Sequence, residues 1–484
     1  MSADNGDAPL GDIPPEEFQR QARRVIEWMG DYLANTERFP VVPRVAPGDI
    51  ASTLPTEPPT TAESLDTILD DFEQLIVPGV THWNHPGFFA YFAITASAPG
   101  ILAEMLMSTL NNNAMLWKTS PSATELELRV MDWLRQLLGL GDGWFGLIND
   151  TASISTLLAL AAAREAKPEL EIRERGMAGR TDLPRLRVYT SAHAHSSVDK
   201  AVLTLGIGHE NVVHIDTDDD FRMRIDALEA AVRDDRARGY LPLATVATVG
   251  TTSTTSIDPV PAIAALCRRE DMWLHVDGSY GGVAAVVPEL RHVLAGVDEA
   301  DSLVVNPHKW LFTPIDLSAM FTRRPDVLRR AFSLVPEYLV TREQDDVVNL
   351  MEYGVQLGRR FRALKLWMVI RAFGADGLAA RLRQQIEMAR ELASWIDETP
   401  GWERVAPVPF SLVCFRYAPA GMSEAERDAA NAAILERVNA SGSAYISHTK
   451  LHGRYVLRLA IGNLRTERRH VENAWRLLRD AAAR

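Results

Sequence analysis

The chain has 484 residues, 46% of them hydrophobic and 24% charged, so it is long and apolar enough to form a large core. Its net charge of −13 argues against a general binder of nucleic acid or anionic membranes, because both need basic surfaces. The first 12 residues are acidic without an apolar core, and no apolar run could span a bilayer, so we expect a cytoplasmic enzyme.

The N-terminal region is predicted to be helical and then extended. Residues 13–34 open with prolines and acids and place Phe18, Val25 and Ile26 on one face, which is typical of an amphipathic helix. Residues 39–62 are rich in proline and threonine and predict an extended connector. Residues 1–12 are expected to be disordered.

Short β-type runs alternate with helical stretches between about residues 98 and 365. This alternation predicts an α/β layer with a mostly parallel sheet, whose ligands bind beyond the carboxyl ends of the strands. Asp226 is a plausible N-cap of one of the helices. From about residue 366, long helices and strands at 410–417 and 454–461 predict a smaller α+β domain. The strands of the layer are expected at 185–190, 211–215, 243–249, 272–276, 302–305 and 318–322.

Several common functional motifs are absent from the sequence. There is no Walker A motif and no G-x-G-x-x-G, so the sequence contains neither of these motifs for binding the phosphates of a nucleotide or dinucleotide. The stretch "HENVVH" (209–214) resembles a zinc motif, but on a helix its histidines would not share a face, so no metal site is expected. Cys267 and Cys414 lie in apolar stretches and are expected to be buried free thiols.

Polar residues follow the ends of several predicted strands. Each of them alone has an ordinary structural explanation, but in an α/β sheet these positions converge on one crevice. Pyridoxal phosphate needs a lysine amine for a Schiff base, an acid beside its pyridine nitrogen and donors around its phosphate. The sequence offers such groups in His195, Thr251, Thr252, Asp277 and Lys309.

The motifs around these residues resemble those of a known family. "NPHKW" (306–310) resembles the lysine motif of the pyridoxal-phosphate group II amino-acid decarboxylases, and "WLHVDGSYGG" (273–282) resembles their "HVDAAYAG" motif. "AHSSVDKA" (194–201), "TSPSATELE" (119–127), "LGRRFRALKLW" (357–367) and "YVLRLAI" (455–461) also match family stretches. The similarity runs from about residue 13 to the end and is greatest to the aromatic-L-amino-acid decarboxylases.

The resemblance implies a fold-type I homodimer with shared active sites. Residues 1–97 would wrap the partner, residues 98–365 would bind pyridoxal phosphate, and residues 366–484 would form the small domain. Lys309 would form the Schiff base, Asp277 would pair with the ring nitrogen, His195 would stack on the ring, and Tyr338 on the loop 333–350 would protonate the substrate Cα. Thr252 would lie beside the cofactor, His308 would meet the cofactor or the substrate carboxylate, and Ala152, Ser153 and Asn306 would contact the phosphate.

The resemblance also implies a pocket for a flat ring. It would include Trp83, Tyr91 and Phe92, and Gly358 would leave room for a larger ring such as indole. Asn113 and Met115 stand where a partner subunit lends apolar residues, and the Asn113 amide would either bind a polar ring substituent or face the dimer contact. Asp150 replaces a glycine near the phosphate loop, where an acid should repel phosphate unless it turns away or meets a cation.

The expected reaction is decarboxylation of an aromatic L-amino acid to its arylalkylamine. Tryptophan, phenylalanine, tyrosine and their hydroxylated forms are not separated by the sequence. One alternative is an aromatic acetaldehyde synthase, but such relatives typically lack the tyrosine or the histidine that this chain keeps as Tyr338 and His195. Another is a group II decarboxylase for glutamate or diaminobutyrate, which would need a charged pocket residue. A catalytically inactive scaffold would be expected to lose Lys309 or Asp277.

Overall fold

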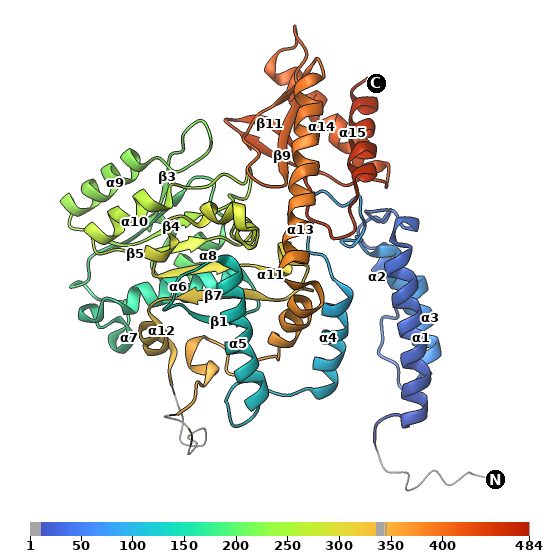
Figure 1. Ribbon diagram of the computed structural model, residues 1–484, viewed down its shortest axis with the longest axis horizontal. Coiled ribbons are helices and arrows are strands. Elements are labelled where there is room, and N and C mark those ends of the chain that lie inside the picture. Colours follow the sequence, from blue (N-terminus) through green and yellow to red (C-terminus); the bar gives the residue numbers. More distant parts are fainter. Residues whose placement is uncertain (1–10, 335–342, 344–345, 484) are drawn as a thin grey trace.

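The structure is a computed structural model that describes residues 11–334, 343 and 346–483 (Figure 1). Its centre is a seven-stranded sheet in the order β1-β7-β6-β5-β4-β2-β3. Strands β3, β2, β4, β5 and β6 pair in parallel, while β7 is antiparallel to both β6 and β1. The mostly parallel α/β layer is thereby confirmed. The strands are β1 (Phe145–Asn149), β2 (Leu186–Ser191), β3 (Val212–Ile215), β4 (Leu241–Thr248), β5 (Trp273–Asp277), β6 (Ser302–Val305) and β7 (Ser318–Thr322).

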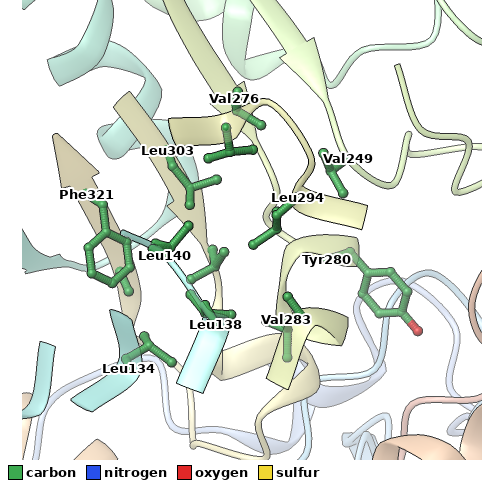
Figure 2. Packing of buried hydrophobic residues seen from close by; sticks show 14 of the residues in the cluster. Leu134, Leu138, Leu140, Val249, Val276, Tyr280, Val283, Leu294, Leu303 and Phe321 are labelled. Atoms are coloured by element: carbon green, nitrogen blue, oxygen red, sulfur yellow. The ribbon is translucent and has the colours of Figure 1, made fainter. Parts of the chain in front are cut away.

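Helices cover both faces of this sheet, as expected for parallel strands with near-continuous apolar runs. One face packs on α5 (Pro121–Leu138), α9 (Ile225–Ala237), α10 (Val260–Arg269) and α13 (Ala363–Glu398). The other packs on α6 (Ala152–Glu165), α8 (Ser197–Thr204) and α12 (Pro325–Phe332). Figure 2 shows Leu134 and Leu138 of α5 beside Leu303 and Phe321 of the strands, all in one buried cluster.

One expectation about local structure is wrong. Asp226 is not an N-cap, because α9 begins at Ile225 with Arg224 in the cap position and the Asp226 carboxylate pairs with the Arg224 guanidinium from the first turn. The strand expected at 211–215 is present as β3, so in "HENVVH" His209 lies in a 3₁₀ turn (His209–Asn211) and His214 lies in the strand. Cys267 and Cys414 are buried free thiols, as predicted.

The C-terminal part forms a second, four-stranded antiparallel sheet in the order β10-β11-β9-β8. Helix α13 leads to it and is broken at Gly374, whose φ of 65° suits glycine. Strands predicted at 410–417 and 454–461 are present as β9 and β11. The elements are β8 (Trp402–Arg404), β9 (Leu412–Tyr417), β10 (Ser447–Leu451), β11 (Arg454–Ala460), α14 (Glu424–Ala440) and α15 (Arg468–Ala482).

The N-terminal helices lie to one side of the large sheet (Figure 1). Helix α1 (Pro15–Ala34) confirms the predicted amphipathic helix, and its Arg20 and Arg24 pair with Asp66 and Asp70 of α3 (Leu65–Asp71). The predicted extended connector contains a short helix, α2 (Asp49–Thr53), and α4 (Ala98–Leu110) follows. Residues 1–10 lie outside the described residues. No helix within the described ranges is long and apolar enough to cross a membrane.

Candidate active site

A cavity of about 380 Å³ opens at the carboxyl ends of β4, β5 and β6. Ten residues that the sequence analysis assigned to the cofactor or the substrate line it together: Tyr91, Phe92, Ala152, Ser153, His195, Thr252, Asp277, Asn306, His308 and Lys309. Thr251, the other threonine that the sequence analysis singled out, is fully buried and does not line it.

Lys309 reaches the cavity from a one-turn helix, α11 (Pro307–Trp310), directly after β6. The buried neighbours His308 and Trp310 hold this turn, and the Lys309 Nζ lies 5.5 Å from the centroid of the Phe92 ring. Burial lowers the pKa of Lys309 below its ordinary value, and attraction to Asp277 opposes that shift. A lysine amine with a lowered pKa is a better nucleophile near neutral pH.

Asp277 is the last residue of β5 and is buried. Its Oδ1 accepts hydrogen bonds from the Ser279 amide at 3.0 Å and the Ser279 hydroxyl at 2.5 Å. Within the described ranges, no donor contacts its Oδ2. The Oδ1 atom is therefore held in place, while the Oδ2 atom is available to accept a hydrogen bond from a protonated ring nitrogen.

Two histidines that line the cavity each have a backbone amide at their Nδ1 atom. His195 follows β2 and its Nδ1 accepts the Ser197 amide at 3.1 Å, while the Nδ1 of His308 accepts the Leu317 amide at 3.0 Å. These backbone donors leave the proton of each neutral ring on Nε2. Burial lowers the pKa of His195, and burial with the charge of Lys309 lowers the pKa of His308 to about 3. Both rings are thus neutral donors near pH 7.

The opposite end of the cavity suits an anion. Helix α6 begins at Ala152, so the free amides of its first turn and its positive end face a group bound there. Asp150 does not face that group, because its Oδ1 accepts the Thr151 amide at 2.5 Å and the Thr151 hydroxyl at 3.1 Å. Asp150 therefore meets the first of the two conditions that the sequence analysis set, because its carboxylate turns to Thr151 and away from the phosphate position.

Aromatic rings form one wall of the site. Phe92 stacks on Tyr280 at 3.9 Å, and Tyr280 stacks on the buried Trp310 at 4.7 Å. Arg458 of β11 lies over Phe92 at 5.6 Å and donates to the carbonyl oxygen of Thr252 at 2.7 Å. The small C-terminal sheet therefore fixes the rim of a cavity that the large sheet carries.

Some residues assigned from the sequence do not line this cavity. Trp83 packs on Phe88 and Tyr91 at 4.3 and 6.0 Å. Asn113, Met115 and Gly358 form a separate group, in which the Asn113 Oδ1 accepts the Arg359 amide at 3.0 Å and its Nδ2 contacts the Met115 sulfur at 3.4 Å. Tyr338 lies outside the described residues.

Several lining residues had no role in the sequence analysis. Ser279 and Tyr280 lie inside the quoted aspartate motif, and Arg458 is a single cation in the apolar run "YVLRLAI". A buried arginine in an apolar strand is a signal in itself, because such a charge needs a dedicated partner set. The full set that the sequence analysis missed is Thr151, Thr248, Gly250, Ser279, Tyr280 and Arg458.

The family description "Pyridoxal-dependent decarboxylase conserved domain" matches residues 47–418. The chain belongs to this family. It is 40% identical to tyrosine decarboxylase 4 of Petroselinum crispum, over 98% of this chain and 95% of that one. It is 38% identical to a phenylacetaldehyde synthase of Arabidopsis thaliana, over 98% and 97% of the two chains. The crystal structure of Oryza sativa TDC with PLP and tryptamine superposes with a TM-score of 0.94 at 36% identity, covering 99% of each chain.

The cavity fits the cofactor of this family, pyridoxal phosphate. Two buried polar atoms, the Asn306 Oδ1 and the Thr248 Oγ1, have no hydrogen-bond partner in the described part of the chain, although both residues line the cavity. The cavity also offers one group for each part of the cofactor. The amine suits its aldehyde, the carboxylate oxygen without a donor suits its pyridine nitrogen, and the helix N-terminus suits its phosphate. The fold-type I architecture inferred from the resemblance is confirmed by the same superposition.

Proposed function

We propose that the chain decarboxylates aromatic L-amino acids to arylalkylamines and carbon dioxide. The observation that carries the proposal is that Lys309 and Asp277 line one cavity together with the stacked rings of Phe92 and Tyr280, behind which Trp310 is buried. A flat aromatic substrate gains burial and ring contacts in such a site. The tyrosine decarboxylase and the tryptamine-bound relative support this substrate class.

Each cavity residue has a proposed part in this reaction. The Lys309 amine binds the cofactor covalently, and the Asp277 Oδ2 keeps the ring nitrogen protonated. When bound, pyridoxal phosphate accepts the electron pair that the departing carboxylate leaves. His195 stacks on the ring, and the His308 Nε2–H donates to the cofactor or the substrate carboxylate. Thr252 lies beside the cofactor, and Ala152, Ser153 and Asn306 hold the phosphate.

The aromatic wall also excludes water from the reacting carboxylate. Loss of carbon dioxide replaces a localised charge by a dispersed one, so a dry pocket favours the step. The amine product then requires a proton at the substrate Cα, and we assign this transfer to Tyr338. The presence of a phenylacetaldehyde synthase among the relatives keeps decarboxylation with oxidative deamination as the second candidate function, in which dioxygen would be the oxidant and would be reduced to hydrogen peroxide as aldehyde and ammonia are released.

The substitution Tyr338→Phe separates the two candidates. If Tyr338 is the proton donor, the variant releases less amine and more aldehyde and ammonia than the wild-type enzyme. An unchanged product ratio would remove Tyr338 from that role. The wild-type enzyme itself should release amine and carbon dioxide in equal amounts without ammonia, and aldehyde with ammonia would make it a synthase.

We also propose that the enzyme is a cytoplasmic homodimer whose two chains share their active sites. Each chain would consist of an N-terminal segment that ends at residue 97, a cofactor-binding domain that ends at residue 365, and a small C-terminal domain. Leu102, Leu106 and Leu110 form a stripe on α4 with exposed fractions of 49%, 51% and 62%. Such a row of exposed leucines marks a protein interface. It leads directly into Asn113 and Met115, which would join Trp83 and Gly358 in a shared substrate pocket. Leu106→Glu should convert the dimer to a monomer in analytical ultracentrifugation, and a wild-type monomer would contradict the proposal.

The substrate class is tested with purified enzyme, pyridoxal phosphate and a panel of L-amino acids. Mass spectrometry should detect amines only from tryptophan, phenylalanine, tyrosine or their hydroxylated forms. Turnover restricted to glutamate or diaminobutyrate would contradict the aromatic assignment. Since Asn113 offers an amide donor, Asn113→Leu tests whether it selects substrates with a polar ring substituent.

A further inference from the structure

Three metal-ligating side chains meet on the surface near the edge strand β3, outside the cavity described above. The His209 Nε2 lies 3.2 Å, and the His214 Nε2 lies 3.1 Å, from the same oxygen of Asp199. One ligand atom of each residue lies within 4.8 Å of the other two. Among the residues that the structure describes, Asp199, His209 and His214 are the one set of His, Cys, Asp or Glu side chains whose ligand atoms lie close enough together to hold a metal ion.

The fold brings these residues together for simple reasons. Side chains alternate along a strand, so His214 points to the same face of β3 as Val212. Val212 packs in the apolar cluster that contains Val198 and Val202 of α8, which places His214 over the first turn of that helix, where Asp199 lies. His209 precedes the strand and reaches the same carboxylate from its 3₁₀ turn.

The turn that carries His209 is held by hydrogen bonds of its own. Gly208 enters it with a φ of 92°, a conformation that glycine adopts without strain. The Asn211 side chain donates to the carbonyl oxygen of Ile207 at 2.6 Å, and Arg187 donates to the carbonyl oxygen of Glu210 at 2.7 Å. The His209 backbone is thus fixed without any ligand, so little ordering is needed before one binds.

We propose that Asp199, His209 and His214 form a binding site for a divalent transition metal ion of the zinc class. Two imidazole nitrogens and a carboxylate oxygen are ligands that Zn²⁺ prefers, at about 2.0–2.2 Å each. Ligand atoms around a tetrahedral ion with such bonds lie about 3.3 Å apart, which is close to the separations of both histidine nitrogens from the Asp199 oxygen. Exposed fractions of 64% and 44% for the histidine side chains leave room for water as a further ligand.

The proposed ion would fasten the edge of the sheet to the start of α8. This is the helix whose first residue, Ser197, donates its amide to the His195 Nδ1 in the cavity. The site is therefore structural rather than catalytic, because both of its histidines are exposed and none of its three residues lines the cavity. Binding to the folded chain alone should raise its melting temperature, and above saturation the rise should follow the logarithm of the metal concentration.

The test uses the full-length enzyme with its cofactor bound, after treatment with a chelator and removal of the chelator. Zn²⁺ is added in a calorimetric titration, and Co²⁺ is added in parallel to record its ligand-field absorption. The wild-type enzyme should bind one Zn²⁺ per chain, with a higher melting temperature when bound. His209→Gln and His214→Gln should each weaken binding at least about tenfold, since even outer-shell changes cost about 10- to 100-fold.

His292→Gln is the matched control, because His292 is an exposed histidine whose ring, within the described part of the chain, hydrogen-bonds only to the backbone oxygen of Glu289. Equal affinity in this control and in the His214 variant would overturn the proposal, and so would the absence of saturable binding by the wild-type enzyme. Should the histidine variants fail to fold, Asp199→Asn decides, because it keeps the size of the side chain while removing the anionic ligand. Unchanged Zn²⁺ affinity in that variant would also overturn the site.

Discussion

Two lysines, the half-buried Lys309 in α11 and the fully buried Lys365 in the first turn of α13, differ in what their amines contact. The Lys365 Nζ donates to the carbonyl oxygens of Pro314 at 3.2 Å and Asp316 at 2.9 Å and pairs with Glu104 at 3.0 Å. Within the described residues, no hydrogen bond or ion pair of the Lys309 Nζ is found, and its nearest cation–ring contact is Phe92. Burial lowers the pKa of both amines.

Two of the buried acids, Asp258 and Asp277, show the same contrast. The Asp258 carboxylate accepts the Met223 amide on one oxygen at 2.7 Å and the Thr248 amide on the other at 2.8 Å. Asp277 uses only its Oδ1 in this way. A buried charge with all its partners stabilises the fold, while one with an unused atom is available for a ligand. The comparison separates catalytic groups from structural ones of the same residue type.

The largest effect should come from Lys309→Ala. The variant should fold, lose the visible absorption of the lysine-bound cofactor and fall below detectable turnover, because no other amine lines the cavity among the described residues. Absorption spectra and product assays check this result. If the variant kept both the visible absorption and the turnover, another lysine would bind the cofactor. Lys309 would then not differ from Lys365 in the way described above.

Asp277→Asn should lower kcat by about 10²- to 10³-fold, the effect of removing one preorganised electrostatic contact. An amide cannot stabilise a protonated ring nitrogen as a carboxylate does. Asp258→Asn is the matched control: it should lower the melting temperature through the mismatch with its two amide donors, with a smaller effect on kcat. Equal kinetic losses in the two variants would contradict the distinction between these acids.

Lys365→Met should destabilise the fold by up to about 3 kcal/mol, since it leaves the Glu104 Oε2 and two carbonyl oxygens without their lysine partner, while Arg360 still pairs with the Glu104 Oε1 and Glu104 remains partly solvated. Denaturant unfolding measures this change. The variant should keep the visible absorption of the bound cofactor and its turnover below the melting transition. A folded variant that loses the cofactor would show that Lys365 also serves the active site.

The sequence predicts the central strands well, because strands buried on both faces are continuous apolar runs. Strands β6 and β7 begin and end where the sequence analysis placed them. Strand β1 was not predicted, since Gly146 interrupts its apolar run. In the structure this glycine allows close approach of α5, because a Cβ there would lie 2.8 Å from the Met131 side chain. That constraint belongs to packing and is invisible in a single sequence.

The sequence also identifies the site residues that follow strand ends, such as Asp277 and Lys309. It does not assign Arg458, because a residue of the small sheet reaches this cavity only through the tertiary fold. It set His209 and His214 aside as a metal pair by testing them only on a helix, although it also expected a strand at 211–215. The helical period separates them, but the turn and the strand in which they lie bring both to Asp199. Whether a segment is assumed to be a helix or a strand thus decides which of its side chains are predicted to lie close together.

The smallest of these effects should come from Ser279→Ala, which sharpens the contrast between the two oxygens of Asp277. The Ser279 hydroxyl stands where the family's "HVDAAYAG" motif has alanine, and it donates to the Asp277 Oδ1 at 2.5 Å. Its loss should weaken cofactor binding by about tenfold, consistent with a hydrogen bond to a charged group. The Ser279 amide still holds the carboxylate, so kcat at saturating cofactor should change less. Absorbance titration of the apoenzyme with pyridoxal phosphate measures the affinity, and an unchanged dissociation constant would show that the amide alone positions Asp277.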